Sequence, residues 1–252
     1  MTFRVSQSLR REVAIRRVSQ RWFGIRDRKL AVSPTSSILS VLAAYRILLA
    51  QTLRPPLLWL LSAFVIANMA GAPAGVIVPL LIKFNLAADW AAHDLTFETT
   101  LALLGVASGI GGVLGGLLVS TWGGLKRDRV YGVLVPMLAA GIVQVIYGLS
   151  PLMLISAVAA FIGAAMGPIL NAHSQSIWQS HTPRELQGRV FSIRRLIAWT
   201  ILPVSTAIGD TLAGLFDPGY MLAVLGTIYA LFSAAQLFNP YLLRVEESGV
   251  RH

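Results

Sequence analysis

A few polar side chains interrupt the long apolar stretches of this sequence. Asn171 and Gln175 are four residues apart, so they share one face if their segment is helical. Asn68 lies within an earlier apolar stretch and Trp199 within a later one. Amides in apolar surroundings can bind the polar part of a small molecule, and an indole can contact its aromatic part. These four residues are the candidates for a substrate cavity. The alternative for Asn68 is a hydrogen bond between helices, and for Trp199 it is helix packing.

Other polar groups in the same stretches have simpler expected roles. A lone histidine near a helix end, His173, can titrate, but we expect a hydrogen-bonded packing residue. Arg194 and Arg195 are expected to extend to the lipid headgroups, because long basic side chains near the ends of membrane helices do so. Asp210 is expected at the opposite interface. We therefore expect no proton-carrying carboxylate deep in these stretches.

The sequence does not indicate catalytic, metal or cofactor chemistry. Its 252 residues contain no Cys, which excludes a thiol nucleophile and a Cys-ligated metal. No His/Glu metal-binding spacing and no Walker Gly-Lys-Ser/Thr loop is present. The formal net charge of +10 would suit nucleic acid, but basic loops facing anionic headgroups explain it better. We expect a protein that is not an enzyme and that binds no metal, cofactor or nucleic acid.

Long charge-poor stretches predict the fold class. Charged residues make up 13% of the sequence, against about 25% in soluble domains. A hydrocarbon core about 30 Å thick needs about 20 apolar helical residues, and these stretches are too apolar for barrel strands. The sequence therefore predicts an all-α integral membrane protein with six transmembrane helices. The predicted spans are 57–82, 101–122, 130–149, 151–177, 190–214 and 220–243.

The remaining charges are sorted by side. If the N-terminus is cytosolic, all but one of the 21 Lys and Arg residues fall in cytosolic segments, and only Lys83 lies outside. The acids divide between both sides. This is the positive-inside pattern, so both termini are expected in the cytosol. We expect no signal peptide. The other segments are predicted to be a basic leader, partly disordered or an interfacial helix, over 1–37, an amphipathic linker helix over 38–54, the six-span part over 55–244 and a cytosolic tail over 245–252.

Gly and Pro are frequent inside the predicted spans. The second span has glycines at small-xxx-small spacings, 105/109, 111/115 and 112/116, which allow a neighbouring helix to approach closely. In the first span, Pro73 and Pro79 permit a kink, because proline leaves a backbone carbonyl without its usual donor.

Two predicted cytosolic turns combine glycines with basic residues. Gly123, Gly124 and also Gly188 can adopt a positive φ and turn the chain sharply. Lys126 and Arg127 can contact helix C-termini or lipid phosphates. The turns either form a gate that pairs across two halves of a transporter or only anchor the helices. Their residues are Gly116, Ser120, Gly123, Gly124, Lys126, Arg127, Pro183, Gly188 and Arg189.

These turns resemble those in the C-terminal half of a major facilitator superfamily transporter. The turn from Gly116 to Arg127 resembles the family's motif of Gly, three residues, an acid, then Gly and basic residues, although Ser120 replaces the acid. The turn from Pro183 to Ser192 is close to the family's usual sequence at this turn. Residues 38–57, which precede the first span, resemble the end of the family's central linker. The resemblance is to the bacterial drug-efflux branch that includes macrolide and siderophore exporters. It implies secondary-active efflux of small amphiphilic molecules across the bacterial inner membrane.

The length of the chain bears on its partners. The family has about twelve spans in two halves, with substrate bound between them near the midplane, and this sequence supplies one half. Beyond the lipid bilayer and a small-molecule substrate, we therefore expect an N-terminal six-span half as partner. The chain is expected to be a fragment of a longer transporter that lacks this half and is inactive alone. The alternatives are a half encoded as a separate chain and a second copy of this chain.

Two other functions fit six spans. The membrane domain of an ATP-driven exporter would need long cytosolic helices and a nucleotide-binding partner, and the short loops 122–130 and 179–190 argue against it. A non-transporting membrane scaffold is the remaining alternative.

Overall fold

The computed structural model describes residues 55–182 and 187–245, without the side chains of Pro55 and Arg189. All belong to one compact unit, Leu48–His252. The predicted leader 1–37 and linker 38–54 lie outside the described residues. Those described form only helices and their connections. The helices are α3 (Pro55–Gly71), α4 (Ala74–Phe84), α5 (Ala87–Ala92), α6 (Phe97–Trp122), α7 (Tyr131–Leu149), α8 (Met153–His181), α9 (Gln187–Ala213), α10 (Pro218–Gln236) and α11 (Pro240–Leu243).

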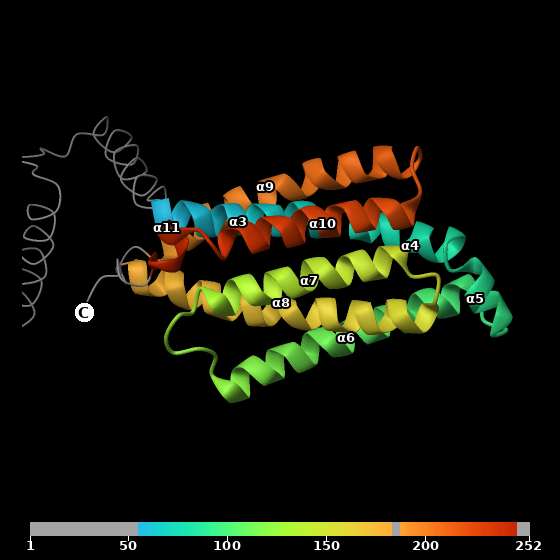
Figure 1. Ribbon diagram of the computed structural model, residues 1–252, viewed down its shortest axis with the longest axis horizontal. Helices are drawn as coiled ribbons and strands as arrows, with labels where there is room; N and C mark the ends of the chain where they lie inside the picture. The colour runs from blue at the N-terminus through green and yellow to red at the C-terminus, as the bar shows by residue number, and fades with distance from the viewer. Residues whose placement is uncertain (1–54, 183–186, 246–252) are drawn as a thin grey trace, which may run out of the picture. The chain divides into compact units, whose positions relative to one another are not determined.

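Within the described residues, six helical segments are long and apolar enough to cross a membrane, one for each predicted span. They run side by side in Figure 1, with α3 and α4 together forming the first segment, Pro56–Phe84. Because α11 packs against α3, the start of the first segment and the end of the last lie at the same end of the bundle. The described part of the chain is therefore a multi-pass membrane bundle.

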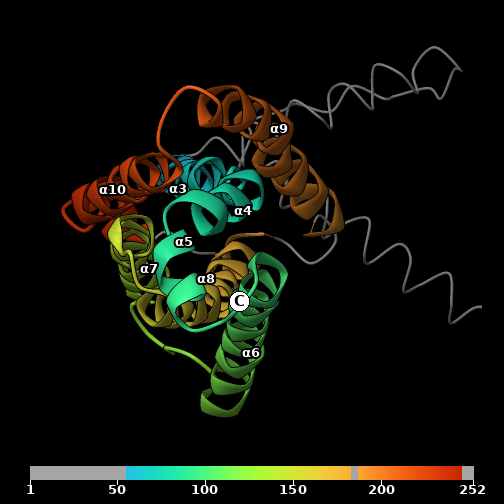
Figure 2. The same ribbon diagram turned by 90° about the vertical axis from the view of Figure 1, so that its right-hand side faces the viewer.

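The helices pack in two groups, and α10 links them because it packs against α7 in one group and against α3 and α4 in the other. On one side α7 packs against α10 and α8, and α6 packs against α8. On the other side α9 packs against α3 and α4. Figure 2, viewed along the bundle, shows α9 and α6 at opposite edges. This arrangement leaves α3, α8 and α9 to line a common space.

Close helix contacts use some glycines and not others. A Cβ at Gly111 or Gly115 would collide with the backbone of α8, at Phe161 and Ala165. The other glycines of the predicted small-residue spacings in α6 meet open space: Gly105, Gly109, Gly112 and Gly116. Only the 111/115 spacing therefore works as predicted within this bundle. The two sets lie about 110° apart around the axis, since each residue turns a helix by about 100°.

The seam between α7 and α10 was not predicted. Added Cβ atoms at Gly141 and Gly148 of α7, or at Gly219 and Gly226 of α10, would collide with the backbone of the other helix. The two glycines of each helix are seven residues apart, so they return to one face after two turns. Because lipid tails are as apolar as Leu, such backbone proximity is what favours helix association in a bilayer.

The kink expected in the first span occurs at Pro73, between α3 and α4, whereas Pro79 stays inside α4. Proline has no N–H to donate to the Met69 carbonyl four residues earlier. That carbonyl instead accepts a hydrogen bond from Ser205 Oγ of α9 at 2.7 Å. The next carbonyl, of Ala70, accepts from Gln144 Nε2 of α7 at 3.0 Å. Side chains from two other helices thus donate to the carbonyls at the break in the helix.

The last predicted span is wrong at its end. It was expected to continue to Leu243, but α10 ends at Gln236 and α11 starts at Pro240. Steric contact with a proline disfavours helical geometry at the residue before it, here Asn239. Asn239 instead caps α11, because its side chain accepts a hydrogen bond from the Tyr241 N–H. The short helix α5 in the connection between α4 and α6 was also not predicted.

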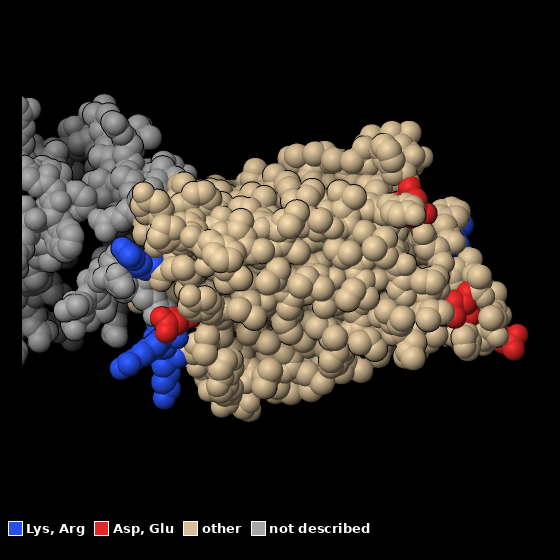
Figure 3. Space-filling model, viewed as in Figure 1, with Lys and Arg blue, Asp and Glu red and all other residues tan. Residues whose placement is uncertain are grey.

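Charged side chains gather at the two ends of the bundle. In Figure 3 most blue side chains lie at the left end, where Lys126 and Arg127 occupy the turn between α6 and α7. Acids at the other end bind helix N-termini: Asp89 Oδ2 accepts from the Met153 N–H that starts α8, at 2.7 Å, and Asp217 caps α10. Carboxylates are favourable there because unpaired N–H groups and the helix dipole attract negative charge.

Candidate functional site

A cleft of about 400 Å³ lies between α3, α8 and α9. It contains all four residues predicted as substrate-cavity candidates, Asn68, Asn171, Gln175 and Trp199, although they come from three separate segments of sequence. The other lining residues are Phe64, Ala67, Leu170, Phe191, Arg194, Arg195 and Ala198. The cleft therefore combines amides, two guanidinium groups and three aromatic rings inside the apolar bundle.

The side-chain amides of Asn68 and Asn171 make different hydrogen bonds. Asn68 Nδ2 donates to the Ala198 carbonyl at 2.7 Å, so this half-buried side chain joins α3 to α9 as well as facing the cleft. Both roles considered for Asn68 are thus compatible with its position. Asn171 is exposed, and its Nδ2 donates to the Gly167 carbonyl of its own helix. Because it also lines the cleft, a ligand there can contact its side chain.

Arg194 does not extend toward the headgroups as predicted. Only 7% of its surface is exposed. Its Nη1 donates to Gln175 Oε1 at 3.0 Å, and its Nη2 donates to Ser174 Oγ at 2.9 Å. The guanidinium carbon lies 4.6 Å from the Phe64 ring centroid and 5.5 Å from that of Trp178. A planar, weakly hydrated guanidinium suits aromatic neighbours, and the two hydrogen bonds turn it inward.

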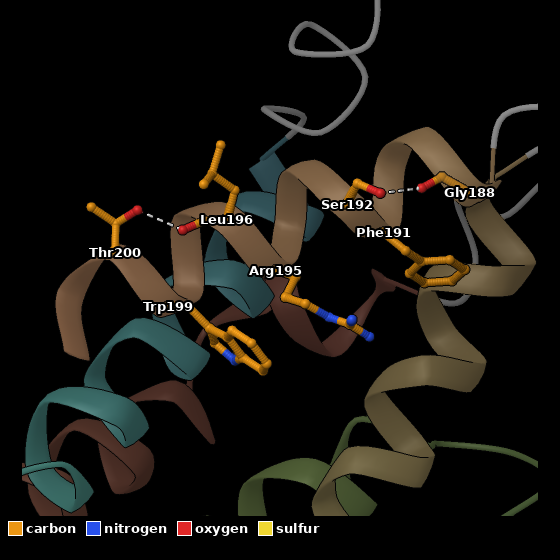
Figure 4. Close-up of a pocket in the computed structure, with 7 residues that line it drawn as sticks. All are labelled: Gly188, Phe191, Ser192, Arg195, Leu196, Trp199 and Thr200. Atoms are coloured by element: carbon orange, nitrogen blue, oxygen red, sulfur yellow. Dashed lines mark hydrogen bonds between the residues drawn. The ribbon is translucent and has the colours of Figure 1, made fainter. Parts of the chain in front are cut away.

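The side chains of Phe191, Arg195 and Trp199 form a stripe along α9. Figure 4 shows them projecting to the same side of the helix, as their spacing of four residues requires. The Arg195 guanidinium carbon is 5.4 Å from the Trp199 ring centroid, and both side chains are exposed. The three also line a hollow of about 630 Å³ with Gly188, Ser192, Leu196 and Thr200. The stripe is an accessible surface with both apolar and cationic character.

The turn between α6 and α7 has the glycine geometry expected. Gly123 and Gly124 have φ values of +78° and +71°. His173 of α8 holds the turn: its Nε2 accepts from the Leu125 N–H at 2.8 Å, while its Nδ1 lies 2.7 Å from the Ile169 carbonyl. The ring is buried and bonded at both nitrogens, which agrees with the expected packing role for His173.

The other residues of this turn lie close to the same end of α6. Ser120 Oγ donates to the Gly116 carbonyl at 2.7 Å, within the helix. Lys126 and Arg127 are exposed in the turn. Their exposure is compatible with either a gate or an anchor, the two roles considered for the turn.

The prediction for the second turn is wrong at Gly188. The sharp turn with a positive φ that Gly188 could have made is not formed, because Gly188 lies in the first turn of α9, where its carbonyl accepts a hydrogen bond from Ser192 Oγ at 2.8 Å. The helix starts earlier than predicted, with Gln187 Nε2 donating to the Thr182 carbonyl. Pro183 and the side chain of Arg189 lie outside the described residues. The glycine therefore sits in the helix and does not form the turn.

The site can bind and orient a ligand through hydrogen bonds, cation–π contacts and charge. In the described residues, no group of three or more His, Asp or Glu side chains could hold a metal ion. Comparison of the chain with family models, curated proteins and solved structures finds no match. What the site can bind therefore follows from its own side chains.

Sequence reasoning missed the role of Arg194. The signal available was a charged residue several positions inside a predicted span, which is costly and marks a functional site when it faces the bundle interior. The competing rule, that basic side chains near helix ends reach the headgroups, fits the neighbouring Arg195 better. Only the packing of α9 on α3 and α8 distinguishes these two adjacent residues.

Proposed function

We propose that this chain is one six-span half of a secondary-active transporter of the major facilitator type, working in efflux of small amphiphilic molecules across the bacterial inner membrane. The cleft between α3, α8 and α9 carries the proposal, because it gathers amides, cations and aromatic rings among membrane-spanning helices. Such groups are costly in a bilayer and mark ligand pathways. The resemblance of the two turns to the family supports the same function.

In this proposal both termini are cytosolic, since the basic residues would then face the anionic leaflet. The cleft is one wall of a path that a second six-span half completes, either a separate N-terminal half or another copy of this chain. A single half leaves the polar wall facing lipid or an unmatched surface. We therefore expect the chain alone to transport nothing.

The test is expression in an efflux-deficient bacterial host, with susceptibility to macrolides and to ethidium as the measurement. The chain alone should leave susceptibility unchanged, and coexpression with an N-terminal half of a major facilitator exporter should lower it. Combining Asn171→Leu with Gln175→Leu should then weaken or redirect efflux. Gln179→Leu is the matched control, because this exposed glutamine lies one turn beyond Gln175 on α8 and outside the cleft.

Two results would contradict parts of the proposal. Efflux by the isolated chain, with crosslinking that shows only monomer, would refute the need for a second half. Efflux by a crosslinked homodimer would instead identify the second half as another copy. Equal loss of efflux in the control and the cleft variants would refute the assignment of the cleft.

A further inference from the structure

Two adjacent arginines, Arg194 and Arg195, face the cleft, and no carboxylate of the described residues pairs with either. We propose that the cleft binds an anionic amphiphile, with a carboxylate, phosphate or sulfonate group on Arg194 and Arg195 and an apolar body along Phe191 and Trp199. This inference rests on the proposed function in so far as the ligand is the transported molecule. The binding site itself stands on the contacts of the two arginines.

Arg194 is fixed in position and still has donors to offer. It is more than nine-tenths buried, and it lines the cleft. Within the described residues, Ser174 and Gln175 accept from two of its five N–H donors, and both acceptors are neutral. The aromatic rings of Phe64 and Trp178 occupy two other directions around the guanidinium. The remaining donors can meet an anion in a preset geometry, as guanidinium groups commonly do.

The charge around the site is unbalanced. An ion pair joins His93 to Asp89, but at the other end of the bundle. On α9 itself the only acid is Asp210, about 24 Å along the axis from Arg194 by helical rise. A buried cation in a spanning segment without an anionic partner is costly. A ligand that carries the missing negative charge would remove that cost and gain both Coulomb attraction and hydrogen bonds.

Arg195 supplies a second cation at the rim. It is exposed, and it lies over Trp199, one turn along α9. Phe191 and Trp199 flank it on the stripe visible in Figure 4. An anion that reaches Arg194 past Arg195 therefore leaves the rest of its molecule against aromatic surface. The cleft volume of about 400 Å³ is within the usual range for small ligands, roughly 300–1,000 Å³.

An anionic amphiphile can come from two sources. One is a soluble molecule, the cargo of the proposed transport, and the other is the headgroup of an anionic lipid, since the first turns of α9 are close to an interface. Both offer the same chemistry to the arginines. The experiment therefore includes separate measurements for each source.

The test uses the full chain in nanodiscs of phosphatidylcholine, which has no net charge. Tritiated 2-naphthalenesulfonate is the anionic probe, and 2-naphthalenemethanol is its neutral match. Saturable binding of the sulfonate, displaced by excess cold sulfonate but not by the neutral compound, is expected. Native mass spectrometry on discs that contain phosphatidylglycerol measures whether the chain retains that lipid.

Three arginine variants separate the cleft from general charge. Arg194→Gln should weaken sulfonate binding at least about tenfold, because a charge-assisted hydrogen bond contributes about 1.5–3 kcal/mol. Arg195→Gln should weaken it severalfold, and this exposed position guards against failure of Arg194→Gln to fold. Arg194→Lys should bind better than Arg194→Gln. Arg244→Gln, which removes one exposed charge just after α11, should bind like the wild type.

The possible results have distinct meanings. Equal binding of the sulfonate and the neutral compound, or unchanged binding in both Gln variants, would overturn the anion site. Arg194-dependent retention of phosphatidylglycerol without sulfonate binding would overturn the assignment of the anion as cargo. Selective sulfonate binding without efflux by the paired halves would refute the proposed function but not the site. Efflux of ethidium without sulfonate binding would support the proposed function and overturn the anion site.

Discussion

The imidazole of His173 on α8 accepts a hydrogen bond from the backbone N–H of Leu125 at 2.8 Å. The other ring nitrogen lies 2.7 Å from the Ile169 carbonyl, so Nδ1 carries the proton and the ring is a neutral tautomer. The contact ties the turn after α6 to the last third of α8. Gly124 and Gly132 leave room for the ring, because a Cβ at either position would meet it.

His173→Phe should therefore loosen this turn. The substitution leaves the Leu125 N–H without its acceptor, at an expected cost of about 1–3 kcal/mol of folding free energy. Gly132→Ala should be destabilising by a different route, because its methyl group would displace the ring. Thermal unfolding of the purified chain in detergent measures both. His93→Phe is the control, since His93 is exposed in the opposite connection, and an equal loss there would contradict this account.

Glycines of α6 should differ sharply in their tolerance of substitution. Gly111→Ala and Gly115→Ala should each destabilise the bundle by about 1–3 kcal/mol, since a Cβ would push α6 away from α8. Gly109→Ala and Gly112→Ala meet open space and should not destabilise the chain alone; the higher helix propensity of Ala should stabilise it by up to about 1 kcal/mol. Unfolding in a graded denaturing detergent compares the four. Uniform effects would mean that α6 does not approach α8 through this face.

The effects of substitutions at Ser205 and Pro73 on stability should be coupled, because both residues determine which donor serves the Met69 carbonyl. Ser205→Ala should cost about 0.5–1.5 kcal/mol, because the Met69 carbonyl loses its donor. In a Pro73→Ala background the residue at position 73 regains an N–H that can serve the same carbonyl, so Ser205→Ala should cost less. A double-mutant cycle on unfolding free energies measures this coupling. Strict additivity of the two substitutions would show that Ser205 acts independently of the break.

Topology can be tested with reporters. The distribution of basic residues predicts that a reporter fused after Leu243 is cytosolic and that one inserted within the connection Asp89–Asp94 is outside. Alkaline phosphatase and green fluorescent protein activities give the two readouts in bacterial cells. A cytosolic signal from the connection would reject the proposed orientation while leaving the helical bundle intact.

The sequence by itself determined the number and approximate limits of the spanning helices. Long apolar runs without charges can satisfy their backbone in lipid only as helices, so local composition was sufficient. It also indicated the bend near Pro73 and the positive φ values of Gly123 and Gly124, since these depend on the residue and its immediate neighbours. The break before Pro240 was missed, although its cause is also local: a proline disfavours helical geometry at the residue before it.

Tertiary structure alone decided which faces meet. Gly111 and Gly109 look equivalent in sequence, yet only Gly111 contacts α8. Arg194 and Arg195 are adjacent, yet one is buried between α8 and α3 and the other is exposed. The grouping of Asn68, Asn171, Gln175 and Trp199 in one cleft also required three helices to pack. Helix rotation in a bilayer is set by interhelical packing and not by burial from water, so a pattern of apolar residues cannot reveal it.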